Sequence, residues 1–158
     1  MNKQIRLGLG FGLTSGIITT LGLIVGLQAS TESRLVVISG ILVIALCDAL
    51  SDAFGMHVAE EAEQKREIKN LWVASLVTFL SKAVFSMSYA VFFFLLAMNQ
   101  AVYLSIAWSL FLISIFGYYI AKLHGHSPWK VVSEHVVVAV LVILASHLIG
   151  TFIHSALF

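Results

Sequence analysis

The chain has 158 residues, of which 59% are hydrophobic and 11% are charged, and its formal net charge is +1. Soluble domains carry roughly 25% charged residues, so this composition and a mean hydropathy of +0.99 exclude an ordinary soluble surface. With one proline and several apolar runs near the ~20 residues that cross a bilayer, residues 1–158 predict a single all-α membrane domain. We expect it to contact the lipid bilayer and to have no nucleic-acid partner.

Uncharged runs and the breaks between them predict five transmembrane helices, at about residues 6–28, 35–62, 70–98, 101–122 and 132–156. Five spans place the termini on opposite sides of the membrane. Cytoplasmic loops are enriched in Lys and Arg, and one side collects seven of these residues, against Arg34 alone on the other: Lys3, Arg6, Lys65, Arg66, Lys69, Lys122 and Lys130. We therefore expect an integral, multi-pass protein, of the cell membrane if prokaryotic, with a cytoplasmic N-terminus and a C-terminus outside or lumenal.

Small residues recur along the first predicted helix. Gly8, Gly12 and Gly16 are four residues apart, and Gly22 and Gly26 repeat this spacing. Glycines so placed let two helix backbones approach closely in lipid. They predict either tight packing within one protomer or the seam of a symmetric homodimer. The basic start of the chain raises a cleaved signal peptide as an alternative, but this apolar stretch exceeds the usual core of about 7–15 residues.

The second predicted helix carries a stripe of polar residues. Asp48, Asp52, Met56 and Glu60 follow one another at four-residue steps and therefore share one helix face. From a rise of 1.5 Å per residue, Asp52 lies about 12 Å and Asp48 about 18 Å inward of Glu60. The same estimate places Lys82 of the third helix about 18 Å deep. Asp48 and Lys82 are thus expected at one level near the middle of the membrane.

These residues predict an ion path. Two carboxylates with a thioether suit a divalent metal of intermediate hardness, such as Fe²⁺ or Mn²⁺. One helix supplies too few ligands, and the first helix offers further hydroxyl groups from Thr14, Ser15, Thr19 and Thr20, with Ser15 and Thr19 as the expected polar lining. Acidic residues after the stripe predict a cytoplasmic mouth that concentrates cations, formed by Glu61, Glu63 and Glu67.

A structural explanation competes with this one. An ionised side chain inside the membrane needs a partner or a function, and Asp48 with Lys82 as its counter-ion can form a neutral pair that only holds two helices together. Asp52 would then have no partner, which makes it the stronger functional candidate. The chain would be a membrane scaffold or partner subunit. Protonation of Asp52 is a third possibility, in a carrier of protons or of an organic cation.

Other signals are weaker. Cys47 is the single cysteine and lies in an apolar run, so it supports neither a disulfide nor a thiolate metal site. His124 and His126 are two residues apart in a loop, where solvated side chains are the simpler interpretation. No P-loop, nucleophile elbow or HExxH motif is present, and we expect no enzyme activity and no permanently bound cofactor.

The order of motifs resembles the vacuolar iron transporter family. The resemblance extends over all five predicted spans, through "GLTSGIITTLGLIVGL", "DALSDAFGMHVAEEAEQ", "TFLSKAVF" and "GYYIAKLHGHSPWKVVSEHVVVAVLVILASHLIG". It implies a five-helix protomer that dimerises through its first helices, here the face of Gly8, Gly12 and Gly16. It further implies export of Fe²⁺ or Mn²⁺ from the cytoplasm in exchange for protons, along the first two helices.

The chain departs from the family pattern at several positions. Ser15 stands where members have an acidic residue before the glycine, and Asp52 follows Ser51 where a methionine is usual. The third helix has Lys82 and no proline, and only a short, highly charged segment stands where eukaryotic members insert a cytosolic metal-binding domain. A fixed ammonium beside the path can occupy the place of a cation.

Overall fold

A computed structural model describes residues 3–63 and 68–157, apart from the side chains of Lys69 and His124. Its described elements are all helical: α1 (Lys3–Thr31), α2 (Arg34–Val43), the π-helical turn η1 (Ile44–Asp48), α3 (Ala49–Glu61), α4 (Ile68–Leu95), α5 (Met98–His124) and α6 (Pro128–Leu157). α2, η1 and α3 follow one another as one span, so the described residues contain five helices long and apolar enough to cross a membrane. The predicted all-α fold of five spans is confirmed.

Local capping explains where the first spans end. Glu32 adopts a left-handed φ of 50° directly after α1, and the Ser33 side chain accepts a hydrogen bond from the N–H of Val36 at the start of α2. Serine is a favoured residue at a helix N-cap, because its oxygen satisfies an amide that has no partner within the helix. The turn between the first two spans is therefore encoded by its own residues.

The turn between α4 and α5 lies earlier than predicted. The sequence placed it after residue 98, whereas α4 ends at Leu95 and α5 begins at Met98. The Gln100 side chain accepts a hydrogen bond from the N–H of Ala97, and Arg34 Nη2 donates to the carbonyl of Leu96 at 2.7 Å. The sequence did not reveal this break because it lies within an apolar run. The groups that stabilise it are the side chains of Gln100 and of Arg34, which is distant in the sequence.

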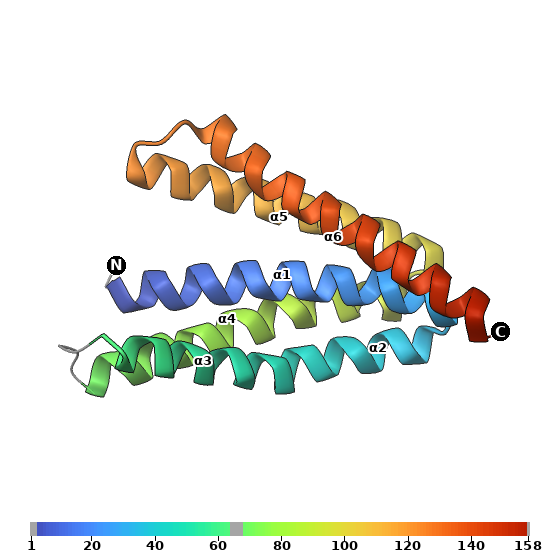
Figure 1. Ribbon diagram of the computed structural model, residues 1–158, viewed down its shortest axis with the longest axis horizontal. Helices are drawn as coiled ribbons and strands as arrows, with labels where there is room; N and C mark the ends of the chain where they lie inside the picture. The colour runs from blue at the N-terminus through green and yellow to red at the C-terminus, as the bar shows by residue number, and fades with distance from the viewer. Residues whose placement is uncertain (1–2, 64–67, 158) are drawn as a thin grey trace.

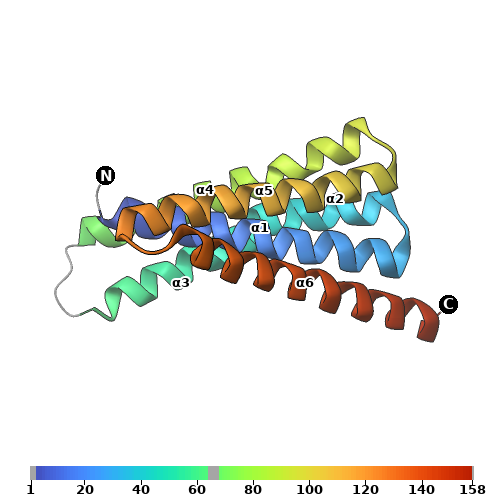
Figure 2. The ribbon, with the colours of Figure 1, turned by 90° about the horizontal axis from the view of Figure 1, so that it is seen from above.

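α1 is the central helix and contacts every other span. It runs between the hairpin of α5 and α6 on one side and the pair formed by α3 and α4 on the other (Figure 1). α5 and α6 lie over α1 in the perpendicular view (Figure 2) and lean away from it towards the end of the bundle where α1 begins. We call this the N-terminal end; the C-terminus lies at the opposite end.

The glycines of α1 allow close contact with two different helices, α4 and α6. A Cβ on Gly8 would lie 2.5 Å from the carbonyl oxygen of Ala74, and one on Gly12 would meet Ser81 and Thr78, all in α4. Further along α1, Gly22 and Gly26 face α6 instead, where their nearest neighbours include Ser146. The close approach predicted from the glycine spacing is therefore present within the chain.

The described core consists of two apolar clusters. One gathers Ile24, Val37, Tyr89, Phe93 and Val102 with their neighbours. The other lies between α1, α5 and α6 and includes Leu13, Ile17, Leu21, Ile113 and Ala139. Most of α6 faces outward, and its exposed residues are mainly large apolar ones, such as Leu141, Leu148 and Phe152. A surface of this kind fits the hydrocarbon of a bilayer.

We expect Gly12→Ala to lower the stability of the folded chain, because its new methyl group would overlap Ser81 and Thr78 of α4. Overpacking of this kind costs about 1–3 kcal/mol. Gly55→Ala is the matched control, since nothing lies within 4 Å of a Cβ at that position, and both variants gain the same helix propensity. Thermal unfolding in detergent should show a lower midpoint for Gly12→Ala only. Equal midpoints for both variants would contradict the contact.

Candidate functional site

Lys82 of α4 is the centre of the intramembrane polar cluster. Its side chain is fully buried, and its Nζ lies 2.5 Å from Asp48 Oδ2 and 2.6 Å from Asp52 Oδ2. Nζ also donates a hydrogen bond to Ser15 Oγ at 2.9 Å. One ammonium group therefore joins three spans: α4, the span formed by α2, η1 and α3, and α1.

Ser15 completes the cluster from the side of α1. Its hydroxyl donates to Asp52 Oδ2 at 2.6 Å while it accepts from Lys82. The neighbouring Gly16 makes this possible, because a Cβ there would lie 3.2 Å from the Cα of Lys82. Thr19, the other predicted lining residue, donates to the carbonyl of Ser15 at 2.7 Å. Its hydroxyl bond therefore stays within α1, whereas that of Ser15 reaches the carboxylate.

A π-helical turn directly precedes the two carboxylates. η1 ends at Asp48, and the N–H of Ala49 bonds to the carbonyl of Ile44, five residues earlier. Single π turns inside α-helices occur frequently at functional sites. Hydrophobic periodicity gives no signal for such a turn, and we did not predict it.

The cluster carries more negative than positive charge. Two carboxylates share one ammonium group, which leaves a formal excess of one negative charge when all three groups are ionised. The Asp48 side chain is 41% exposed and the Asp52 side chain 20% exposed. The excess charge thus lies on the accessible side of the cluster, where a low dielectric strengthens its attraction for a cation.

The expectation that Asp52 has no partner is wrong. The sequence argument matched Asp48 with Lys82 by depth alone, and that pair is present. Asp52 lies one helical turn further along the same face, and the long lysine side chain contacts both carboxylates. Lys82 is therefore the shared counter-ion of both carboxylates and balances one of their two negative charges.

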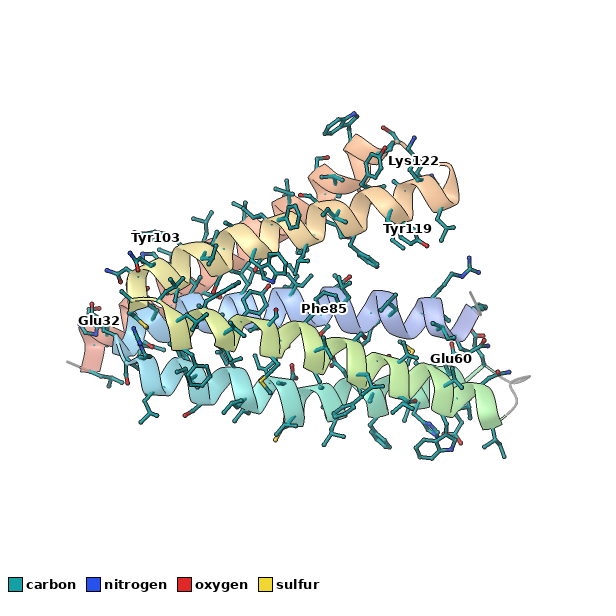
Figure 3. All side chains as sticks on the ribbon, turned by 180° about the vertical axis from the view of Figure 1, so that it is seen from behind. Glu32, Glu60, Phe85, Tyr103, Tyr119 and Lys122 are labelled. Carbon is teal, nitrogen blue, oxygen red and sulfur yellow. The ribbon has the colours of Figure 1, made fainter. Side chains whose placement is uncertain are left out.

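The rest of the predicted stripe continues along α3 after Asp52. Met56 lines a cavity together with Gly10 of α1 and Phe116 of α5. Glu60 is 5% exposed, at the N-terminal end of the bundle (Figure 3). The residues of the predicted mouth come after Glu60 in the chain. Glu61 and Glu63 are exposed, and Glu67 lies outside the described residues.

His57 is a feature that the sequence argument left aside. Its ring packs against Trp72 with centroids 4.8 Å apart. Its Nδ1 is buried and has no hydrogen-bond partner within residues 3–63 and 68–157. The side chain that covers it, Trp72, belongs to the neighbouring α4, so the position of His57 in the sequence alone does not reveal this contact.

The oxygen atoms gathered around Lys82 are the donors that this cluster offers to a metal ion. They come from Asp48, Asp52 and Ser15. Among the described residues, no group of three or more His, Cys, Asp and Glu side chains is placed to hold a metal. A divalent ion would therefore rely on two carboxylates and a hydroxyl, with further oxygen ligands from water or from a second copy of the chain.

Comparison with known proteins agrees with the resemblance noted in the sequence. A profile of the VIT family matches residues 52–151, which is more than half of the chain. The matched segment includes Asp52 and Lys82, and it begins after Ser15 and Asp48. A search of curated proteins finds no match. With its five membrane-spanning helices, the chain therefore belongs to the VIT family, the family of the vacuolar iron transporters.

Proposed function

We propose that this protein transports a divalent metal ion, Fe²⁺ or Mn²⁺, across the membrane, with Asp48 and Asp52 as its ligands at the middle of the path. One observation carries the proposal: three oxygens from two spans converge on a single cationic atom of a third, Lys82 Nζ, at 2.5 to 2.9 Å. Carboxylate and hydroxyl oxygens suit ions of this hardness. Membership of a transporter family supports the same conclusion.

In this mechanism the metal ion and Lys82 compete for the same carboxylates. The ammonium carries one positive charge against two negative ones, whereas a divalent ion balances both. The favoured cargo is therefore doubly charged. When the ion leaves, the ammonium returns to the two aspartates, so that neither carboxylate remains unpaired in the membrane, where an isolated charge is costly.

The charges at the N-terminal end of the bundle support one direction of transport. Glu60, Glu61 and Glu63 lie at the N-terminal end, where their charge would attract cations. The excess of Lys and Arg on that side supports a cytoplasmic location for it. We therefore propose export from the cytoplasm, with protons moving in the opposite direction and binding to the carboxylates that the metal leaves.

A homodimer is part of the same proposal. Gly8, Gly12 and Gly16 contact α4 within the chain, which corresponds to the first of the two alternatives for the glycine spacing. A second copy would then meet another face. Leu46 and Leu50 are 54% and 59% exposed, so this span offers an apolar face to a second copy.

A second candidate function rests on the depth at which Lys82 is buried. A fully buried ammonium held by two carboxylates and a hydroxyl is also what a permanent structural tie requires. The chain would then be a membrane scaffold or partner subunit that moves no ion. The two functions differ in what happens when the lysine is removed.

Transport tests the proposal directly. In proteoliposomes, Asp52→Asn should reduce Mn²⁺ or Fe²⁺ uptake by roughly tenfold or more, because a ligand contribution of about 1.4 kcal/mol already corresponds to a factor of ten. Glu32→Gln is the matched control, as an exposed acidic residue beyond the end of α1. Wild-type rates in Asp52→Asn would remove this carboxylate from the path.

Metal binding separates the two functions. Because Lys82 competes with the metal for both carboxylates, Lys82→Met should bind Mn²⁺ roughly tenfold or more tightly than the wild type in isothermal titration. It should also release the metal more slowly during transport. Absence of Mn²⁺ binding in the wild type and in Lys82→Met alike would favour the scaffold.

Thermal stability measures how strongly the cluster of Lys82, Asp48 and Asp52 holds the helices together. Lys82→Met leaves two carboxylates without their cation, and breaking a buried pair costs about 3–5 kcal/mol. A variant that also carries Asp48→Asn and Asp52→Asn should recover most of the lost thermal stability, since it leaves no unpaired charge. Asn substitution at either aspartate alone should have a smaller effect, because the ammonium keeps one partner. Equal unfolding midpoints across this series would show that the cluster adds nothing to helix packing.

A further inference from the structure

A cavity of about 510 Å³ lies between α1 and α5 at the N-terminal end, with Met56 of α3 also in its lining and no residue of the Lys82 cluster among the lining residues. Leu7, Phe11 and Phe116 are among its mainly apolar lining residues. Figure 3 shows Tyr119 extending from α5 into the space between the two helices. Cavities that bind small molecules span roughly 300–1,000 Å³, so this one is large enough for a ligand.

The cavity is open towards the lipid-facing surface. Leu7 is 38%, Phe11 46% and Tyr119 51% exposed, although all three line it. Apolar cavities do not hold ordered water, and a void beside apolar side chains loses dispersion contacts. The chemistry of these walls and their access from the bilayer both favour a hydrocarbon chain as the occupant.

Positive charge lies at the outer end of the same cavity. Lys3 and Arg6 belong to its lining, and both side chains are exposed. Across the described ranges 3–63 and 68–157, neither has an ion pair or a side-chain hydrogen bond. α1 has no acidic residue in its first turn, so the positive end of its helix dipole adds to the two cations.

We propose that this cavity binds one anionic phospholipid, with an acyl chain between α1 and α5 and its phosphate at Lys3 and Arg6. The order along α1 matches such a molecule, since the two cations precede Leu7 and Phe11 in the direction of the membrane interior. Basic pockets between membrane helices bind anionic head groups in this way. The site needs no metal and is independent of the transport function.

Charge argues against a second copy of the chain as the occupant. A two-fold contact presents the same surface from both partners, so a dimer across this cavity would bring both copies of Lys3 and Arg6 together. A neutral phospholipid would fill the apolar part equally well but would leave these cations unbalanced. The anionic lipid satisfies both parts of the cavity.

The test uses the full chain in nanodiscs that contain equal amounts of phosphatidylglycerol and phosphatidylcholine, released for native mass spectrometry. The wild type should retain phosphatidylglycerol in roughly thirtyfold preference, since two basic residues near an anionic lipid together contribute about 2 kcal/mol. The double variant Lys3→Gln with Arg6→Gln should lose this preference. Lys130→Gln, an exposed cation of α6 outside the cavity lining, is the matched control and should keep it.

Two further measurements locate the lipid. Gly10→Leu should reduce retention of both lipids by filling the cavity, and a Cβ at Gly10 meets only Phe116 at 3.6 Å. In the wild type, phosphatidylglycerol with a photoreactive acyl chain should label peptides that contain Phe11 and Phe116. Equal retention of both lipids by the wild type, or labelling confined to other helices, would overturn the proposal. The proposal would also be overturned if the wild type formed a dimer without bound lipid and Gly10→Leu dissociated that dimer.

Discussion

The ammonium group of Lys82 is the interaction on which the arrangement of the first three spans depends. Two carboxylates would be costly at this depth without a cation, and a lysine would be costly without an anion. Each group is stable there only because the others are present. The same contacts fix the rotation of three helices, since Asp48 and Asp52 of one span and Ser15 of another must all face one atom of α4. The glycines of α1 make this geometry possible, because Gly16 brings the helix backbone against Lys82.

This cluster has the properties of a cation site that is already occupied by the protein's own cation. Its oxygens come from two spans that face the lysine of a third, and its formal charge remains negative after Lys82 is counted. A purely structural pair would be balanced, whereas this group has one carboxylate in excess and leaves Asp48 partly accessible. The imbalance is the physical reason to prefer transport over a static tie. In the transport function that we propose, it would also compensate for the acidic residue that this chain lacks before Gly16 and the methionine that it lacks at position 52.

The bundle has two unlike halves on either side of α1. The half containing α4 is held by close backbone contact and by hydrogen bonds such as that from Thr20 to Ser86 at 2.9 Å. The hairpin of α5 and α6 contacts α1 closely at Gly26 and Gly150 but leans away towards the N-terminal end. The cavity lined by Met56 and Phe116 lies in this opening. Met56 thus lines a mainly apolar cavity, next along the helix from the carboxylates.

The sequence by itself determined the number of spans, their limits to within a few residues and the depth of the charged groups. These properties follow from hydropathy and from the fixed rise of a helix, both of which are local. Span 35–62, for example, is observed as Arg34–Glu61, and the level of Asp48 relative to Lys82 was predicted correctly. The tertiary structure alone decided which neighbour each face meets. It gave Asp52 its partner, turned Gly8, Gly12 and Gly16 towards α4, and placed Met56 in the lining of a cavity that it shares with α1 and α5. Rotation about a helix axis is set by packing against other helices, and depth within one helix carries no information about it.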